Sequence, residues 1–258
     1  MHLKDATILL VDDEPDLRTI IAEWFKREGS RVLVAEDGAE ALNIIQANQV
    51  DVVVSDVRMP VMDGITLLKK VKASGYKSSV MFVSGFTDVI KPRESYDLGV
   101  EAVMSKPVER KQLIAAVTRI LAGRDELWRF PPGAKAEAVL DATFDSLAGA
   151  LSQGLLALGR GGFCILSTLK LAEGPVDLLL DFKVDKRTVT GQGIVRWTTS
   201  PEAEVGVEIG VEITYIDDAN RAWMISLTGP NTSLSFIPRT TAPLPTAMVT
   251  PPTIGAHV

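Results

Sequence analysis

Five polar residues in the first half of the chain have the types and the spacing to bind a divalent cation and a phosphoryl group. They are three aspartates, one serine and one lysine: Asp12, Asp13, Asp56, Ser84 and Lys106. Each stands at the end of a short hydrophobic run that predicts a buried β-strand. Carboxylate oxygens are the ligands that Mg²⁺ prefers, and a carboxylate can also accept a phosphoryl group. A hydroxyl or an ammonium can stabilise the oxygens of the transferring group.

We assign two roles within this set. Asp13 and Asp56 are the expected direct ligands of Mg²⁺, Asp12 supports a metal-bound water, and the backbone carbonyl of Arg58 completes the metal site. Asp56 follows the central strand and is also the predicted site of phosphorylation.

The other two residues are predicted to contact the phosphate. Ser84 would donate its hydroxyl to a phosphoryl oxygen, and Lys106 would neutralise charge on the group. Taken one at a time, the aspartates and Ser84 also have structural explanations, as helix caps or turn residues, and Lys106 before Pro107 is by itself a weak signal. The joint pattern favours chemistry because the five residues follow strands in the order that would bring them together.

Alternating strands and helices must position these residues. Hydrophobic runs predict strands at 6–11, 31–35, 51–55, 79–83 and 101–105, and helical spacing predicts helices at 15–28, 37–48, 63–73, 92–99 and 109–122. This alternation over 1–122 predicts one doubly wound α/β domain with a parallel five-stranded sheet. The carboxyl ends of its strands would form one crevice.

The pattern changes after residue 122. We interpret 123–136 as a linker or an entry loop. We interpret 137–228 as a small antiparallel β-barrel, because strand-like runs recur and helical spacing is lost. The predicted strands are 137–145, 154–158, 163–169, 174–182, 187–198 and 203–215, followed by a short helix to residue 227. The segment 229–258 is rich in Pro and Thr, and we expect it to be disordered.

Composition narrows the class of protein. The chain has 258 residues and a net charge of −6, with 11 Lys/Arg and 15 Asp/Glu after residue 122. An acidic second half without a helix-turn-helix argues against DNA binding. The lone Cys164 allows no internal disulfide, which fits a reducing compartment. No long apolar run or signal peptide is apparent, so we expect a cytoplasmic protein with no membrane insertion.

Residues 5–122 resemble the receiver domain of two-component response regulators. The resemblance rests on four motifs, which are Ile8–Pro15, Ser55–Gly64, Val83–Gly85 and Ser105–Pro107. It implies a flavodoxin-like fold, an acidic Mg²⁺ pocket and phosphorylation of Asp56 by a sensor histidine kinase. It also implies a cis bond before Pro107, dimerisation on phosphorylation, and no enzymatic activity beyond intrinsic autophosphorylation and autodephosphorylation.

Two residues depart from the family pattern. The switch position three residues before the lysine is usually aromatic and is Val103 here, and the position after Lys-Pro is Val108 where phenylalanine is common. The phosphorylation chemistry does not depend on these positions. The route by which the domain signals its state does.

The second half resembles a PilZ domain, a small β-barrel known as a receptor for cyclic di-GMP. Its glycine and apolar tracts carry the resemblance: Gly161–Phe163, Gly174–Leu180, Gly193–Trp197 and Val205–Ile213. The ligand motifs do not match. Arg124 and Arg129 are five residues apart where the family has four, and the stretch 157–162 lacks the expected D/N-x-S-x-x-G. Arg129 and Arg160 are the weak candidates for a phosphate contact.

These observations favour a phosphorylated response regulator whose degenerate PilZ-like domain delivers output by contact with a downstream protein. The alternative is a cyclic di-GMP sensor modulated by the receiver. An aspartate-nucleophile phosphatase is disfavoured because such enzymes carry a second acid two residues after the nucleophile, where this chain has Arg58.

Overall fold

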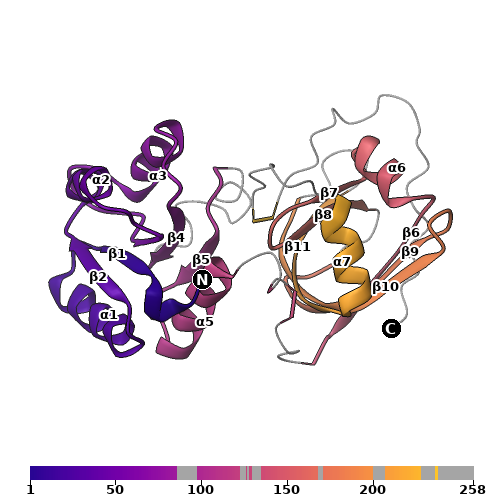
Figure 1. Cartoon of the computed structure of the whole chain (residues 1–258), viewed down its shortest axis with the longest axis horizontal. Coiled ribbons are helices and arrows are strands. Elements are labelled where there is room, and N and C mark those ends of the chain that lie inside the picture. Colours follow the sequence, from indigo (N-terminus) through magenta and orange to yellow (C-terminus); the bar gives the residue numbers. More distant parts are fainter. Residues whose placement is uncertain are drawn as a thin grey trace. The chain divides into compact units, whose positions relative to one another are not determined.

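The chain folds into two compact units, Met1–Asp125 and Glu126–Val258 (Figure 1). The computed structural model describes residues 1–85, 98–122, 126, 128–129, 135–167, 171–199, 207–227 and 236–237. Each unit has its own sheet. None of the helices within these ranges is long and apolar enough to cross a bilayer.

The first unit is a parallel sheet covered by helices on both faces. Its strands have the order β2-β1-β3-β4-β5, and all four pairings are parallel. The strands are β1 (Thr7–Val11), β2 (Arg31–Ala35), β3 (Val52–Ser55), β4 (Ser79–Ser84) and β5 (Ala102–Ser105). The helices are the short η1 (Leu3–Asp5), α1 (Pro15–Arg27), α2 (Gly38–Ala47), α3 (Gly64–Ala73) and α5 (Arg110–Leu121).

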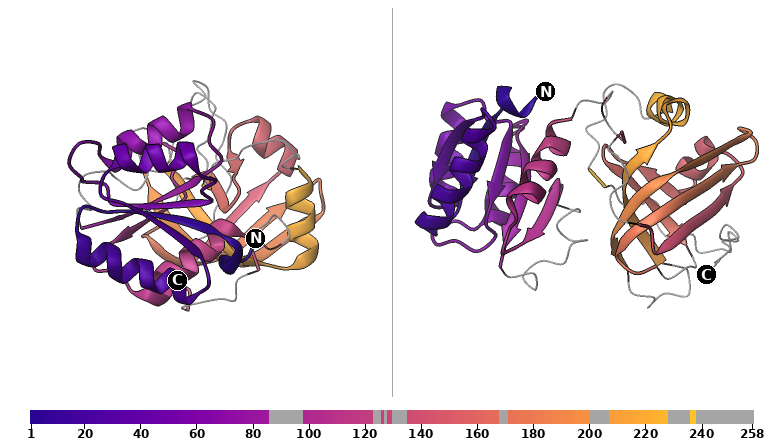
Figure 2. Two further views of the ribbon diagram at one scale, coloured as in Figure 1. Left: turned by 60° about the vertical axis from the view of Figure 1, so that its left-hand side comes forward. Right: turned by 90° about the horizontal axis from the view of Figure 1, so that it is seen from below.

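Helices α2 and α3 lie on one face of this sheet, and α1 and α5 lie on the other (Figures 1 and 2). All four residues of β3 are buried, as expected for a central strand with both faces covered. The core beneath α1 and α5 includes Ile8, Phe25 and Val117, each fully buried. The predicted α/β fold is confirmed, and the helix predicted over 92–99 falls mainly outside the described residues.

The local sequence explains where the helices begin and end. Pro15 stands in the first turn of α1, where its missing N–H costs nothing. Asp37 caps α2 by accepting hydrogen bonds from two backbone amides, and Asp63 caps α3 by accepting one from Thr66. Gly29 follows α1 with φ +88°, a left-handed conformation that suits glycine.

The second unit is built on a curled, mixed sheet of six strands in the order β6-β9-β10-β11-β8-β7. The strands are β6 (Ala138–Phe144), β7 (Leu156–Leu158), β8 (Gly162–Ser167), β9 (Gly174–Phe182), β10 (Arg187–Thr198) and β11 (Val207–Ile216). The prediction of an antiparallel barrel is wrong in two respects. Strand β6 pairs with β9 in parallel, and within the described residues β6 and β7 are the two edges of an open sheet. A parallel pair requires a crossover connection, and α6 (Leu147–Ser152), β7 and β8 provide it.

Glycines allow the long strands of this sheet to bend. The pairing of β10 with β11 shifts register between Gln192 and Gly193, which marks a bulge. A Cβ at Gly191 would lie 2.3 Å from the carbonyl oxygen of Tyr215, so no side chain fits there. Helix α7 (Asp218–Leu227) packs against the sheet through Trp223, whose ring meets that of Phe182 edge-on at 5.3 Å.

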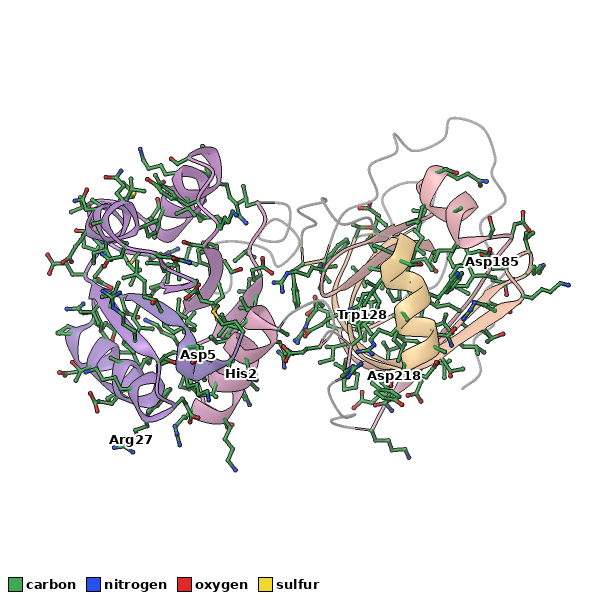
Figure 3. All side chains as sticks on the ribbon, viewed as in Figure 1. His2, Asp5, Arg27, Trp128, Asp185 and Asp218 are labelled. Atoms are coloured by element: carbon green, nitrogen blue, oxygen red, sulfur yellow. The ribbon has the colours of Figure 1, made fainter. Side chains whose placement is uncertain are left out.

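Two segments that we expected to be a linker and a disordered tail contribute to this unit. Trp128 (labelled in Figure 3) is 2% exposed, and its carbonyl accepts a hydrogen bond of 3.1 Å from the Ile216 amide. At this residue the segment 123–136 is therefore part of the second unit, as an entry loop would be, and not a free linker. The prediction of a disordered tail is wrong at Phe236 and Ile237, which are buried. Local composition missed both because each contact is made to distant parts of the chain.

Candidate functional site

The backbone of the parallel sheet brings four of the predicted residues to one edge. Asp12, Asp56 and Lys106 come directly after β1, β3 and β5, and Ser84 is the last residue of β4. The Asp56 amide donates to the Val11 carbonyl at 2.8 Å, and the Lys106 amide donates to the Ser84 carbonyl at 2.9 Å. The strand ends are thus hydrogen-bonded to one another where their side chains meet.

The Lys106 ammonium stands among three carboxylates. Its Nζ lies 2.6 Å from Asp56 Oδ2, 2.9 Å from Asp12 Oδ2 and 3.1 Å from Glu14 Oε1. Burial alone would lower the pKa of Lys106, but its hydrogen bonds to Asp56 and Asp12 raise it above the ordinary value. The ammonium therefore stays charged. The Lys106–Pro107 peptide bond is cis, as the receiver resemblance implied.

The Asp56 carboxylate is buried and held from two sides. Its Oδ2 faces Lys106, and its Oδ1 accepts hydrogen bonds from Ser84 Oγ at 3.0 Å and from the Arg58 amide at 3.1 Å. The residue is 7% exposed. A carboxylate with its position set in this way is suited to in-line attack, because little conformational freedom remains to be lost.

Asp12, Asp13 and Asp56 form a cluster that can hold a metal ion, with one ligand oxygen from each lying within 4.8 Å of the others. Asp12 and Asp56 are buried, and Asp13 is exposed. Burial raises the pKa of Asp12, and its hydrogen bond from Lys106 partly opposes this shift. The oxygen-only donor set and the excess of negative charge fit Mg²⁺.

Several supporting residues were not singled out from the sequence. A Cβ at Gly64 would lie 2.2 Å from the Asp56 carbonyl oxygen, so α3 can begin this close to the strand end only with glycine. Ser55 Oγ donates to the same carbonyl at 2.7 Å. Arg18 donates to the Asp12 carbonyl from the first turns of α1. Gly64 and Ser55 lie within the motif around Asp56, whereas nothing in the sequence marked Arg18.

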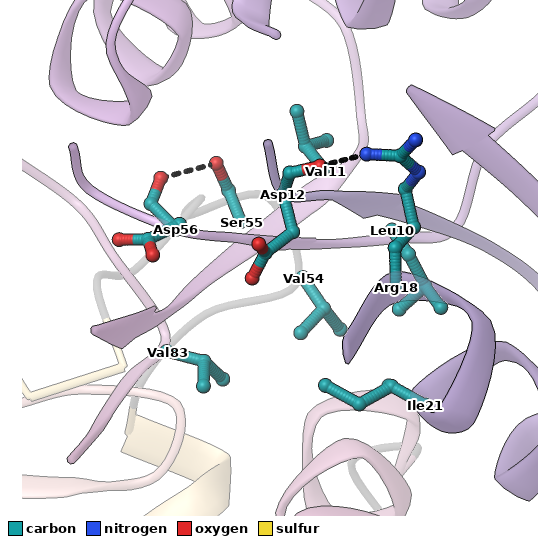
Figure 4. Close-up of a pocket in the computed structure, with 9 residues that line it drawn as sticks. All are labelled: Leu10, Val11, Asp12, Arg18, Ile21, Val54, Ser55, Asp56 and Val83. Carbon is teal, nitrogen blue, oxygen red and sulfur yellow. Dashed lines mark hydrogen bonds between the residues drawn. The ribbon is translucent and has the colours of Figure 1, made fainter. Parts of the chain in front are cut away.

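A small pocket lies beside the two buried aspartates (Figure 4). Its floor is aliphatic, and its polar lining comes from Arg18, Ser55 and the aspartates. The lining residues are Leu10, Val11, Asp12, Arg18, Ile21, Val54, Ser55, Asp56 and Val83. The carboxylates therefore border apolar side chains, which strengthens their interaction with a nearby cation.

The two arginines predicted as weak nucleotide contacts belong to the second unit and have partners of their own. Arg129 forms an isolated β-bridge with Tyr215, and its guanidinium lies 3.7 Å from the Asp218 carboxylate. The Arg160 guanidinium stacks on the Phe236 ring at 5.3 Å. Each arginine thus has a contact within its own unit.

Comparison with known proteins agrees with the geometry of the first unit. Residues 8–118 match the family model for the response regulator receiver domain. The chain is 32% identical over 133 residues to the transcriptional regulatory protein GlrR of Escherichia coli K12, covering 50% of this chain and 30% of GlrR. It is also 32% identical over 125 residues to the E. coli sensor histidine kinase RcsC, covering 47% of this chain and 13% of RcsC. These matches support a response regulator receiver domain in the first unit.

Among solved structures, the first half is similar to the chemotaxis response regulator CheY4 of Vibrio cholerae. The identity is 32%, the match covers 45% of this chain and 98% of that one, and the TM-score is 0.42. The chain spans less than a third of the length of the two curated relatives named above.

Proposed function

We propose that this chain is a two-component response regulator that is phosphorylated on Asp56. The observation that carries the proposal is the buried Asp56 carboxylate, which Lys106 and Ser84 contact beside two further aspartates. In the reaction, an Asp56 oxygen attacks the phosphorus of a phosphohistidine on a sensor kinase. An oxygen–phosphorus bond forms, the phosphorus–nitrogen bond breaks, and the imidazole leaves with the electron pair.

The residues of the cluster would each stabilise the transferring phosphoryl group in a different way. Mg²⁺, held by Asp13, Asp56 and the Arg58 carbonyl, with Asp12 binding one of its waters, would supply positive charge to the phosphoryl oxygens. The Lys106 ammonium already lies 2.6 Å from Asp56, so it is placed to neutralise charge on one of the phosphoryl oxygens. Ser84 Oγ lies 3.0 Å from Asp56 Oδ1 and would donate a hydrogen bond to another phosphoryl oxygen.

The chain's own groups make Asp56 a good acceptor. Lys106 and Ser84 keep its carboxylate oriented before the donor arrives, which lowers the entropic cost of the transition state. Moving the Ser84 hydroxyl from the carboxylate to a phosphoryl oxygen would shift the end of β4. Such a local movement is a means of biasing a two-state element, which suits a signalling role.

We assign output to the second unit, by contact with a downstream protein. The alternative, that this unit binds cyclic di-GMP, gains no support from its arginines. Arg129 already contacts Asp218, and Arg160 stacks on Phe236. Calorimetry with cyclic di-GMP distinguishes the two functions. If the second unit acts by protein contact, titration should give no heat of binding. Saturable binding that is lost in Arg160→Ala would favour the nucleotide sensor.

Phosphoryl uptake tests the proposal directly. The chain is incubated with Mg²⁺ and a small phosphodonor such as acetyl phosphate, and intact mass is measured over time. We expect the wild-type chain to gain one phosphoryl group and Asp56→Asn to gain none. Asp63→Asn is the matched control, because Asp63 caps α3 on the same loop outside the cluster and asparagine preserves capping. A wild-type chain that gains no mass contradicts the proposal.

A further inference from the structure

Two residues near the C-terminal end dock onto the tight turn between β7 and β8. Phe236 and Ile237 are 5% and 1% exposed, although the sequence around them is rich in Pro and Thr. The Gly161 amide donates a hydrogen bond of 2.8 Å to the Phe236 carbonyl. The turn is itself anchored to the sheet, since the Ile213 amide donates to the Gly161 carbonyl at 2.9 Å.

The Phe236 ring lies in the space that a side chain at position 161 would fill, and we call this space the slot. A Cβ at Gly161 would lie 2.3 Å from the ring, and the three atoms nearest to it all belong to Phe236. The neighbouring Gly162 differs, because its Cβ would lie 1.9 Å from the backbone oxygen of Val211. The sheet requires glycine at 162. At Gly161, the atoms closest to an added side chain would be those of the Phe236 ring.

A cation covers this ring. The Arg160 guanidinium carbon lies 5.3 Å from the Phe236 ring centroid, within the range of a cation–π interaction. An aromatic side chain, a backbone hydrogen bond and a stacked arginine are also the contacts by which short linear peptides are recognised at protein surfaces.

We propose that the Arg160–Gly161 turn is a recognition site for a peptide carrying an aromatic residue followed by a branched aliphatic one, and that Phe236–Ile237 fills it as a releasable intramolecular ligand. Tethering gives the docked segment a high effective concentration, so it excludes a competing peptide while it stays bound. While Phe236 is docked, its ring covers a face of Arg160, and any ligand of that face must displace the segment.

Fluorescence anisotropy tests the site with a labelled peptide of residues 231–240. We expect the full-length Phe236→Ala chain to bind this peptide saturably. Wild-type chain should bind at least about tenfold more weakly, because its own segment occupies the slot. Adding Gly161→Ala to Phe236→Ala should weaken binding at least about tenfold by the same steric conflict. Absence of saturable binding to folded Phe236→Ala, or equal binding by all three chains, overturns the proposal.

A second measurement covers the case in which Phe236→Ala fails to fold. The otherwise wild-type chain carries 4-fluorophenylalanine at position 236, and its fluorine spectrum is compared with that of the free labelled peptide. We expect the signal of the intact chain to differ from the peptide signal and to move to it in the Gly161→Ala variant. A signal that Gly161→Ala leaves unchanged contradicts the slot.

Discussion

The two units bury ionic groups in different ways. In the first unit, one ammonium, Lys106, faces the carboxylates of Asp12, Asp56 and Glu14, with Asp13 beside them. In the second unit, the buried Glu212 carboxylate accepts from Arg196 on the adjacent strand, with Nε 2.6 Å from Oε2.

This difference separates a site from a structural ion pair. A carboxylate matched by a guanidinium satisfies the electrostatic requirement of the fold. A cluster with more carboxylates than cations leaves negative charge that a further cation or a proton can neutralise. The first arrangement is therefore expected to have a chemical function, and the second to stabilise the sheet.

The largest effect on phosphorylation is expected from removing the charge of Lys106, and the comparison is with removing the charge of Arg196. Lys106→Met removes a positive charge from the transferring group, so phosphorylation by acetyl phosphate should slow by about 10²-fold. Arg196→Met should leave this rate unchanged and lower the free energy of unfolding by about 3 kcal/mol, because the buried Glu212 carboxylate loses its ion pair with Arg196. Intact mass over time and urea unfolding measure the two quantities. Slower phosphoryl uptake in Arg196→Met would contradict the distinction between a functional site and a structural ion pair.

Gly64→Ala tests whether the site depends on its backbone support. The added Cβ would meet the Asp56 carbonyl oxygen at 2.2 Å, so the strand end or α3 must shift. We expect a loss of about 1–3 kcal/mol in stability together with slower phosphoryl uptake.

Gly85→Ala is the matched control for this variant. Gly85 follows β4 next to the site, but the nearest atom to its Cβ would be Lys106 Cβ at 4.0 Å, an ordinary contact. Its stability and uptake should equal those of the wild-type chain. Equal behaviour of the two alanine variants would show that close packing against Asp56 is unimportant.

Mg²⁺ should stabilise the wild-type chain by occupying the acidic cluster. Binding to the folded state alone contributes about 2.7 kcal/mol when the cation is at 100 times its Kd. Asp13→Asn should reduce the Mg²⁺-dependent rise in Tm, whereas Asp5→Asn, at an exposed site outside the cluster, should not. A rise in Tm that Asp13→Asn leaves intact would place the cation elsewhere.

The same cluster predicts a direction of pH dependence. Burial raises the pKa of Asp12 in the folded chain, so without Mg²⁺ its contribution to stability is present at low pH and is lost as the pH rises through that pKa. Mg²⁺ binds the deprotonated form. The Mg²⁺-dependent rise in Tm should therefore grow as the pH rises through the raised pKa of Asp12, and a rise independent of pH contradicts this.

The smallest expected effect lies in the second unit, at the cap of α7. Hydrogen bonds from the Asn220 and Ala219 amides lower the pKa of Asp217, so its stabilising contribution is present above the unfolded pKa and is lost as the pH falls through the folded one. Asp217→Ala should cost about 1 kcal/mol at neutral pH, measured by urea unfolding. Phosphoryl uptake should not change.

The candidate site was predictable because its residues follow strands of a parallel sheet. Asp12, Asp56, Ser84 and Lys106 each end or follow a hydrophobic run, and the topology places such positions along one edge. Local sequence was therefore sufficient to predict both the fold of the first unit and the proximity of these four side chains. The contact of Arg18 with the Asp12 backbone depends on the orientation of a helix, which local sequence does not specify.

The second unit was less predictable because its defining contacts join distant segments. The parallel pairing of β6 with β9 depends on the path of the intervening chain. Trp128 and Phe236 lie in stretches whose Pro, Gly and Thr content resembles a linker or a tail, yet both are buried. Both residues contact distant parts of the chain: Trp128 is hydrogen-bonded to Ile216, and Phe236 to Gly161.

The most direct test of phosphorylation at Asp56 is to identify the modified residue. Borohydride reduces an aspartyl phosphate to homoserine, so the phosphorylated chain is reduced, digested and mapped by peptide mass. We expect homoserine at position 56 after incubation with Mg²⁺ and acetyl phosphate, and at no other aspartate. Homoserine at position 12 or 13 with Asp56 intact, or no conversion in a chain that gained phosphate, would contradict it.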